Sequence, residues 1–170
     1  SMGLFYNHAG RWNRLAQIDF TDFDTSNAVS MQNFLMGCSA LNSVDFSGFD
    51  TSNVVTMQGM LQNCVALTDV DASPLETGNV QSMRQMFYGC THLKKVNTAG
   101  WDTSKVNTMA FMFQACSSLE NLDASTWNTG NVETMQQMFY NCANLQSVNT
   151  TGWDTGKVTA MVSMFRECPK

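Results

Sequence analysis

Six cysteines recur at a fixed interval of 26 residues, and this spacing constrains the chain more than any other feature. Columns of Leu, Thr and Met keep the same register, beginning at Leu15, Thr25 and Met31, and no insertion interrupts them. A repeat of this length predicts a stack of structural units in which each unit contacts its neighbours. The cysteines are Cys38, Cys64, Cys90, Cys116, Cys142 and Cys168.

The repeat also defines the domain organisation of the 170 residues. Residues 1–14 form a leader or partial capping unit, and residues 15–170 form a single repeat domain without a linker. A longer period is superimposed, because Asp71-Ala72-Ser73 recurs as Asp123-Ala124-Ser125, which indicates duplication of a two-unit block. The six predicted units are 15–40, 41–66, 67–92, 93–118, 119–144 and 145–170.

Each unit begins with an alternation of apolar and polar residues. In the second unit, Val44 and Phe46 alternate with Ser43 and Asp45. A period of two is typical of a short strand with one buried face. We therefore expect a strand at the start of every unit.

The second half of each unit shows the spacing of a helix face. A polar run, Asp50 to Asn53 in the second unit, has the composition of a turn and helix cap. Asn63 lies where a left-handed helix C-cap is expected, as do Gly37 and Gly89 in sister units. The pattern predicts strand, turn, short helix and turn, and thus an α/β fold. The apolar residues at i, i+3, i+6, i+7 and i+10 are Val54, Met57, Met60, Leu61 and Cys64.

The run Asp50-Thr51-Ser52-Asn53-Val54-Val55-Thr56-Met57, followed by Met60-Leu61 and Cys64, resembles the repeat of BspA-like leucine-rich-repeat surface proteins. The likeness recurs six times over residues 15–170. It implies a curved leucine-rich-repeat solenoid with a parallel β-sheet on its concave face, in microbial proteins that are secreted or attached to the cell surface and associated with adhesion. The family has no common catalytic residue to transfer.

The sulfur-containing residues are interpreted as core. Equivalent cysteines on adjacent units would point in parallel rather than toward each other, so buried free thiols are favoured over disulfides. Met pairs such as Met83 and Met86 fit a core-facing stripe better than a soft-metal site.

Catalysis finds no support in the sequence. His92 lies in a column otherwise filled by unrelated residues, and His8 lies in the leader. An enzyme needs a converging base, nucleophile and charge stabiliser. We therefore expect no enzymatic activity, no metal and no cofactor in this chain.

Two polar columns on the predicted strands are the candidate ligand-binding residues. The Asp/Asn column could bind cations or glycans, but we favour hydrogen bonds to the following turn, with Asn relieving repulsion between stacked carboxylates. The other column varies in charge, and recognition and a solvated face are rated equally there. The candidates are Ser43, Asp45, Asp69, Asp71, Lys95, Asn97, Asn121, Asp123, Ser147 and Asn149.

Charge and hydropathy exclude two classes of partner. Nine basic and fourteen acidic residues give a net charge of −5, so the positive footprint that nucleic acid requires is missing. No apolar run approaches the roughly 18 residues of a membrane helix, which argues against membrane insertion in this segment.

The sequence thus predicts a non-catalytic recognition or adhesion module of an extracellular or cell-surface protein. Its partner would be a host or cell-surface protein or glycan, bound through the strand face. One alternative is a structural spacer or stalk. Another is a repeat segment of a larger protein with its enzymatic domain outside this chain, since the chain stops in repeat phase without a polar capping unit.

Overall fold

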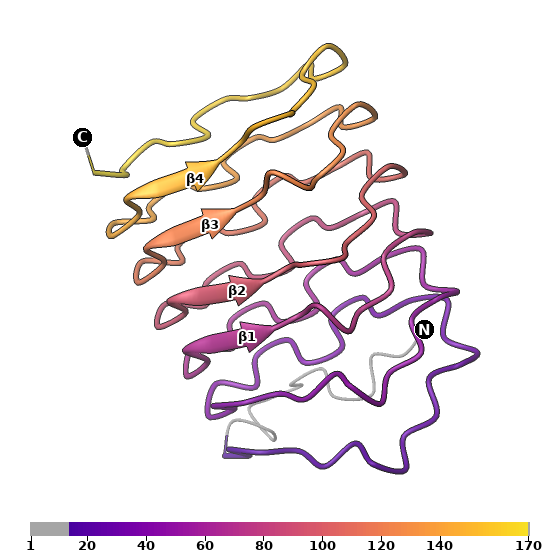
Figure 1. Ribbon diagram of the computed structural model, residues 1–170. Coiled ribbons are helices and arrows are strands. Elements are labelled where there is room, and N and C mark those ends of the chain that lie inside the picture. The colour runs from indigo at the N-terminus through magenta and orange to yellow at the C-terminus, as the bar shows by residue number, and fades with distance from the viewer. Residues whose placement is uncertain (1–13, 170) are drawn as a thin grey trace.

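The chain winds into successive coils that stack one on another (Figure 1). The structure is a computed structural model, and it describes residues 14–169. Each coil takes 26 residues, because backbone groups pair with those 26 positions away along the chain. The leader predicted for residues 1–14 lies outside the described residues, apart from Arg14.

Four short strands lie along one side of the stack. They are β1 (Asp69–Asp71), β2 (Lys95–Asn97), β3 (Asn121–Asp123) and β4 (Ser147–Asn149). β1 pairs with β2 and β3 with β4, both in parallel, and these pairs form two separate sheets.

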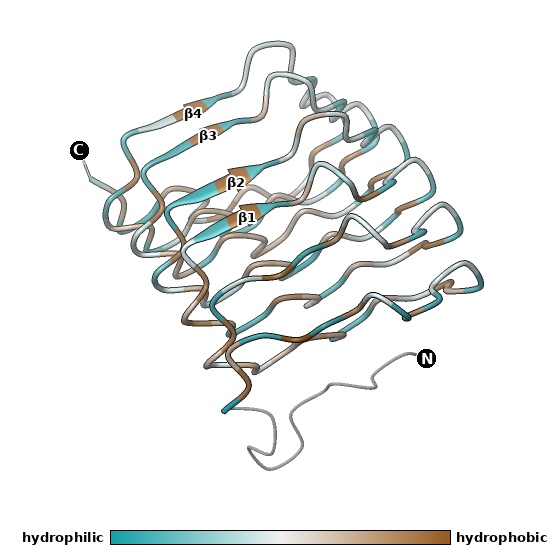
Figure 2. Cartoon of the chain, turned by 60° about the horizontal axis from the view of Figure 1, so that its bottom comes forward, coloured by the Kyte–Doolittle hydropathy of each residue, from teal (hydrophilic) through white to brown (hydrophobic). Residues whose placement is uncertain are grey.

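Every strand has a buried or half-buried middle residue between two exposed ends. Figure 2 shows this as an apolar centre between hydrophilic ends. Val70 and Leu122 are buried and Val96 and Val148 are half-buried, whereas the flanking residues are exposed. The predicted period of two is therefore confirmed in these strands. The expectation of a strand in every unit is wrong for the first two units, because the corresponding segments, residues 17–19 and 43–45, form no strand.

The predicted helices are wrong. Residues 14–169 contain no α-helix, and the segment in question is a series of tight turns. In the second coil, the N–H of Met57 donates to the carbonyl of Ser82 at 3.0 Å and that of Leu61 to Met86 at 2.9 Å, both in the next coil. Between them, the N–H of Met60 donates to the carbonyl of Met57 at 3.1 Å. An α-helix would instead bond each N–H to the carbonyl four residues earlier.

Backbone dihedrals explain why a helix cannot form there. Gly59 and Asn63 have φ of 61° and 59°, in the left-handed region that a right-handed helix excludes. Gly37 and Gly89 also have positive φ, so the predicted left-handed positions are confirmed, but they belong to turns. The α/β strand-turn-helix solenoid is thus corrected to stacked coils of short strands and turns.

A ladder of backbone bridges runs through all six coils on the side formed by these turns. We call it the turn ladder, and it is continuous where the strands are not. It links, in order, Ser30, Thr56, Ser82, Thr108, Thr134 and Ala160.

The core consists of the predicted columns. Five cysteines are buried and Cys168 is half-buried, and all six are free thiols, which confirms that interpretation. The Met column is also core, except in the last coil, where Met161 is 44% exposed and Phe165 48% exposed. Within the described residues no further coil covers those two side chains.

Buried hydroxyls and thiols complete the bonding between coils. Thr51 Oγ1 donates to the carbonyl of Glu76 at 3.0 Å and accepts its N–H at 2.7 Å. Cys90 Sγ donates to the carbonyl of Leu61 at 3.1 Å. Burial raises the pKa of Cys90 to about 12, so this thiol stays protonated and can donate at neutral pH.

Candidate functional site on the strand face

The structure places all ten predicted site residues on one exposed surface, which we call the strand face. They form two columns along the stack. The first column is Ser43, Asp69, Lys95, Asn121 and Ser147. The second column is Asp45, Asp71, Asn97, Asp123 and Asn149.

The second column holds the turns that follow the strands. Asp71 Oδ1 accepts hydrogen bonds from the N–H of Ser73 at 3.1 Å and from its hydroxyl at 2.7 Å. These two bonds lower the pKa of Asp71. The favoured interpretation of this column, hydrogen bonding to the next turn, is therefore confirmed. The corresponding N–H donors to the other members are Ser47, Ala99, Ser125 and Thr151.

Asn within the second column relieves repulsion between its carboxylates. Asn97 Nδ2 donates to Asp71 Oδ1 at 2.9 Å. The pKa of Asp123 is lowered by hydrogen bonds from Ser125 and, to a smaller extent, from the Asn149 side chain. An amide beside each of these two carboxylates supplies donors that a further carboxylate would lack.

The first column is freer to contact a partner. Asp69 and Lys95 are register partners in β1 and β2, yet among residues 14–169 only Arg166 and Glu167 form an ion pair. One contact joins members of this column, a hydrogen bond of 2.6 Å from Ser147 Oγ to Asn121 Oδ1. The side chains of Asp69 and Lys95 have no hydrogen-bond partner within the described part of the chain.

Between β2 and β3 the strand face is interrupted by what we call the seam. Before β2 and β4, the N–H just before the strand donates to the preceding coil, from Lys94 to the carbonyl of Thr68 and from Gln146 to that of Glu120, both at 2.7 Å. The N–H of Thr68, just before β1, makes no such bond within residues 14–169. The N–H of Glu120 makes no such bond to Lys94, nor to any other group in residues 14–169.

A hollow of about 360 Å³ lies at the seam. Sequence reasoning missed three of its residues: Lys94 and Glu120, which precede the strand columns, and Val96, the half-buried middle residue of β2. The two-unit period was the available signal, since it marks alternate joints between coils as different. The hollow is lined by Lys94, Lys95, Val96, Asn97, Glu120 and Asn121.

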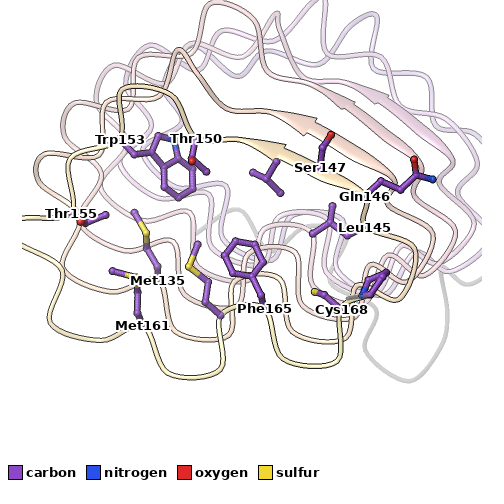
Figure 3. Close-up of a pocket in the computed structure, with 13 residues that line it drawn as sticks. Met135, Leu145, Gln146, Ser147, Thr150, Trp153, Thr155, Met161, Phe165 and Cys168 are labelled. Atoms are coloured by element: carbon purple, nitrogen blue, oxygen red, sulfur yellow. The ribbon is translucent and has the colours of Figure 1, made fainter.

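A larger depression, of about 600 Å³, lies at the last coil (Figure 3). Trp153, Met161 and Phe165 line it, and the Phe165 ring stacks on Phe139 with centroids 5.3 Å apart. These side chains occupy the positions that contact the next coil elsewhere in the stack. Within residues 14–169, the depression is therefore an end of the core that no coil covers.

Within residues 14–169, no three His, Cys, Asp or Glu side chains gather closely enough to hold a metal ion. In that same range, no helix has the length and apolar character needed to cross a bilayer.

Comparison with known proteins identifies a family. No curated protein and no solved structure matches the chain. The family described as "Mycoplasma protein of unknown function, DUF285" matches residues 6–96 and residues 68–170. Together the two matches run from residue 6 to the last residue, in agreement with the repeat seen in the sequence and the coils. The chain therefore belongs to the DUF285 family of Mycoplasma proteins.

Proposed function

We propose that this chain is a non-catalytic recognition module of a secreted or surface-exposed microbial repeat protein of the BspA-like type. It binds a protein or a glycan through the first column of the strand face. The observation that carries the proposal is the contrast between the core columns and the first column of the same coils. The Thr and Cys columns, which are buried in every coil but the last, are invariant over the six coils, while the exposed first column changes from Ser to Asp, Lys, Asn and Ser.

Rigid display would be the mechanism. The turn ladder and the buried Thr and Cys hydrogen bonds fix each coil on the next. Side chains of the first column are then held at the spacing of adjacent parallel strands, roughly 4.8 Å. A partner would meet a preorganised row of polar groups, and little conformational entropy would be lost on binding.

The experiment compares two triple variants on arrays of glycans and extracellular-matrix proteins. Asp69→Ala, Lys95→Ala and Asn121→Ala together change the first column. Gln81→Ala, Asn107→Ala and Glu133→Ala are the matched control. The control residues lie in the same three coils and are also exposed, beside the turn ladder.

We expect the wild type to bind a component of the arrays, the first-column variant to lose that binding, and the control to retain it. Melting temperatures should be similar in all three proteins, because none of the six side chains is buried. Binding that survives in the first-column variant would contradict the proposal. Failure of the wild type to bind any component would favour the spacer alternative instead.

A further inference from the structure

We propose that the hollow at the seam binds one carboxylate group of an acidic sugar. This inference rests on the proposed recognition function and names the ligand class for one position on the strand face. The hollow lies between two coils, so neither coil contains the site alone.

The first argument concerns hydrogen-bond donors. Three donors of residues that line the hollow make no hydrogen bond within residues 14–169. They are the ammonium groups of Lys94 and Lys95 and the backbone N–H of Glu120. Asn121 uses Oδ1 to accept from Ser147, and its Nδ2 likewise makes no hydrogen bond there. A carboxylate has about four lone-pair sites on two oxygens, so it can accept from several such donors at once.

The second argument favours a sugar over a protein. Hot spots of protein interfaces are enriched in Trp, Tyr and Arg, and none of these lines the hollow. The Glu120 carboxylate and the Lys94 carbonyl are acceptors without a donor in the described residues, and sugar hydroxyls can supply donors. The volume of about 360 Å³ falls within the roughly 300–1,000 Å³ of small-molecule sites.

The third argument limits the ligand to a single negative charge at this position. Asp69 and Asp71 lie on β1 and Asp123 lies on β3, and all three are exposed on the strand face. A polyanion extending along the stack would meet these carboxylates and be repelled. A sugar with one carboxylate places its charge beside Lys94 and Lys95 only.

The test uses the full chain with sialyllactose as the probe and lactose as its neutral counterpart. Binding is followed by NMR through the backbone amide of Glu120 and the side-chain amide of Asn121. The site variant carries Lys94→Met and Lys95→Met, which remove the charges and retain the apolar stems. The control carries Lys105→Met and Lys157→Met. Those two lysines donate to Asn79 and Asn131, at 2.6 Å each, and do not line the hollow.

We expect sialyllactose to shift both amide signals in a saturable and salt-sensitive way, and lactose to have no effect. The site variant should bind at least about tenfold more weakly, which corresponds to about 1.4 kcal/mol. The control should bind like the wild type. In the free protein, the Glu120 amide should exchange with solvent faster than those of Lys94 and Gln146, because it lacks an acceptor.

Several results would overturn the inference. These are equal shifts with lactose, unchanged binding in the site variant, tighter binding of the sulfated polyanion heparin, or a protected Glu120 amide in the free protein. If the arrays show binding that depends on the first column while sialyllactose causes no shift, this inference fails and the proposed function stands. If both experiments are negative, both fail.

Discussion

The invariant Thr column provides the sharpest test of how the coils are held together. In Thr51→Val, the β-branched shape is kept and the hydroxyl is lost. Thr51 is fully buried, and its hydroxyl both donates to the carbonyl of Glu76 and accepts its N–H. No other hydrogen bond is seen for either backbone group of Glu76 within the described part of the chain.

The magnitude follows from these two bonds. Each contributes a net 0.5–1.5 kcal/mol or so, and leaving a buried polar group without a partner costs about 1–3 kcal/mol. Because Glu76 is exposed, water can reach part of its backbone. We therefore expect Thr51→Val to lower the free energy of unfolding by about 2–4 kcal/mol. Thr51→Ser keeps the hydroxyl and removes one methyl group, so it should cost about 1 kcal/mol.

Urea unfolding of the wild type and both variants measures the effect. A loss of stability appears as a lower midpoint at an unchanged slope. If Thr51→Val were as stable as Thr51→Ser, the side-chain bond between coils would contribute nothing, and the reasoning would be refuted.

Two further predictions concern titratable groups. Burial raises the pKa of Cys90 and Cys142 to about 12 from a usual 9.0. The contribution of these two buried thiols to the free energy of unfolding should therefore be fully present below pH 9 and should decrease as the pH rises toward 12. The native protein should react slowly with a thiol reagent, and Cys168 should be modified first because it is only half-buried. Rapid modification of all six cysteines would contradict the burial of the other five. Hydrogen bonds from Ser73 lower the pKa of Asp71 in the folded protein. The contribution of the Asp71 carboxylate to the free energy of unfolding is therefore present above the pKa that Asp71 has in the unfolded chain. It is lost as the pH falls through the pKa of Asp71 in the folded protein. Asp71→Asn should therefore lose less stability between pH 6 and pH 3 than the wild type in urea unfolding, and equal losses would count against the Asp71 bonds.

The repeat and the composition of the core could be predicted from sequence, but the local backbone could not. Met57, Met60 and Cys64 recur at intervals of three and four, which fits a helix face and equally fits consecutive turns closed by i to i−3 bonds. The two left-handed positions per coil distinguish these structures. Gly59 and Asn63 are residue types that favour a positive φ, so they indicate these positions in the sequence. Phe111 lies at the position equivalent to Gly59 and has a φ of 61°, but its residue type does not indicate a left-handed backbone.

The site was predictable as a surface and not as a hollow. Alternation within strands was enough to place the two columns. The seam depends on how each joint between coils is bonded, and here Trp127 Nε1 donates to the hydroxyl of Thr98 at 3.1 Å. At the joints on either side, Trp101 and Trp153 donate instead to backbone carbonyls, at 2.8 and 3.0 Å. A column that is Trp in three successive coils gives no indication of that difference.

The turn ladder also determines how the stack would respond to mechanical force. Hydrogen bonds between parallel coils run along the stacking direction, so tension applied to the two ends would load the joints in series. Each coil that peeled away would release up to roughly 90 Å of extended chain. The seam, where β2 and β3 belong to different sheets, would yield at lower force than its neighbours. Pulling would therefore separate the two walls of the hollow before it unravelled the rest of the stack.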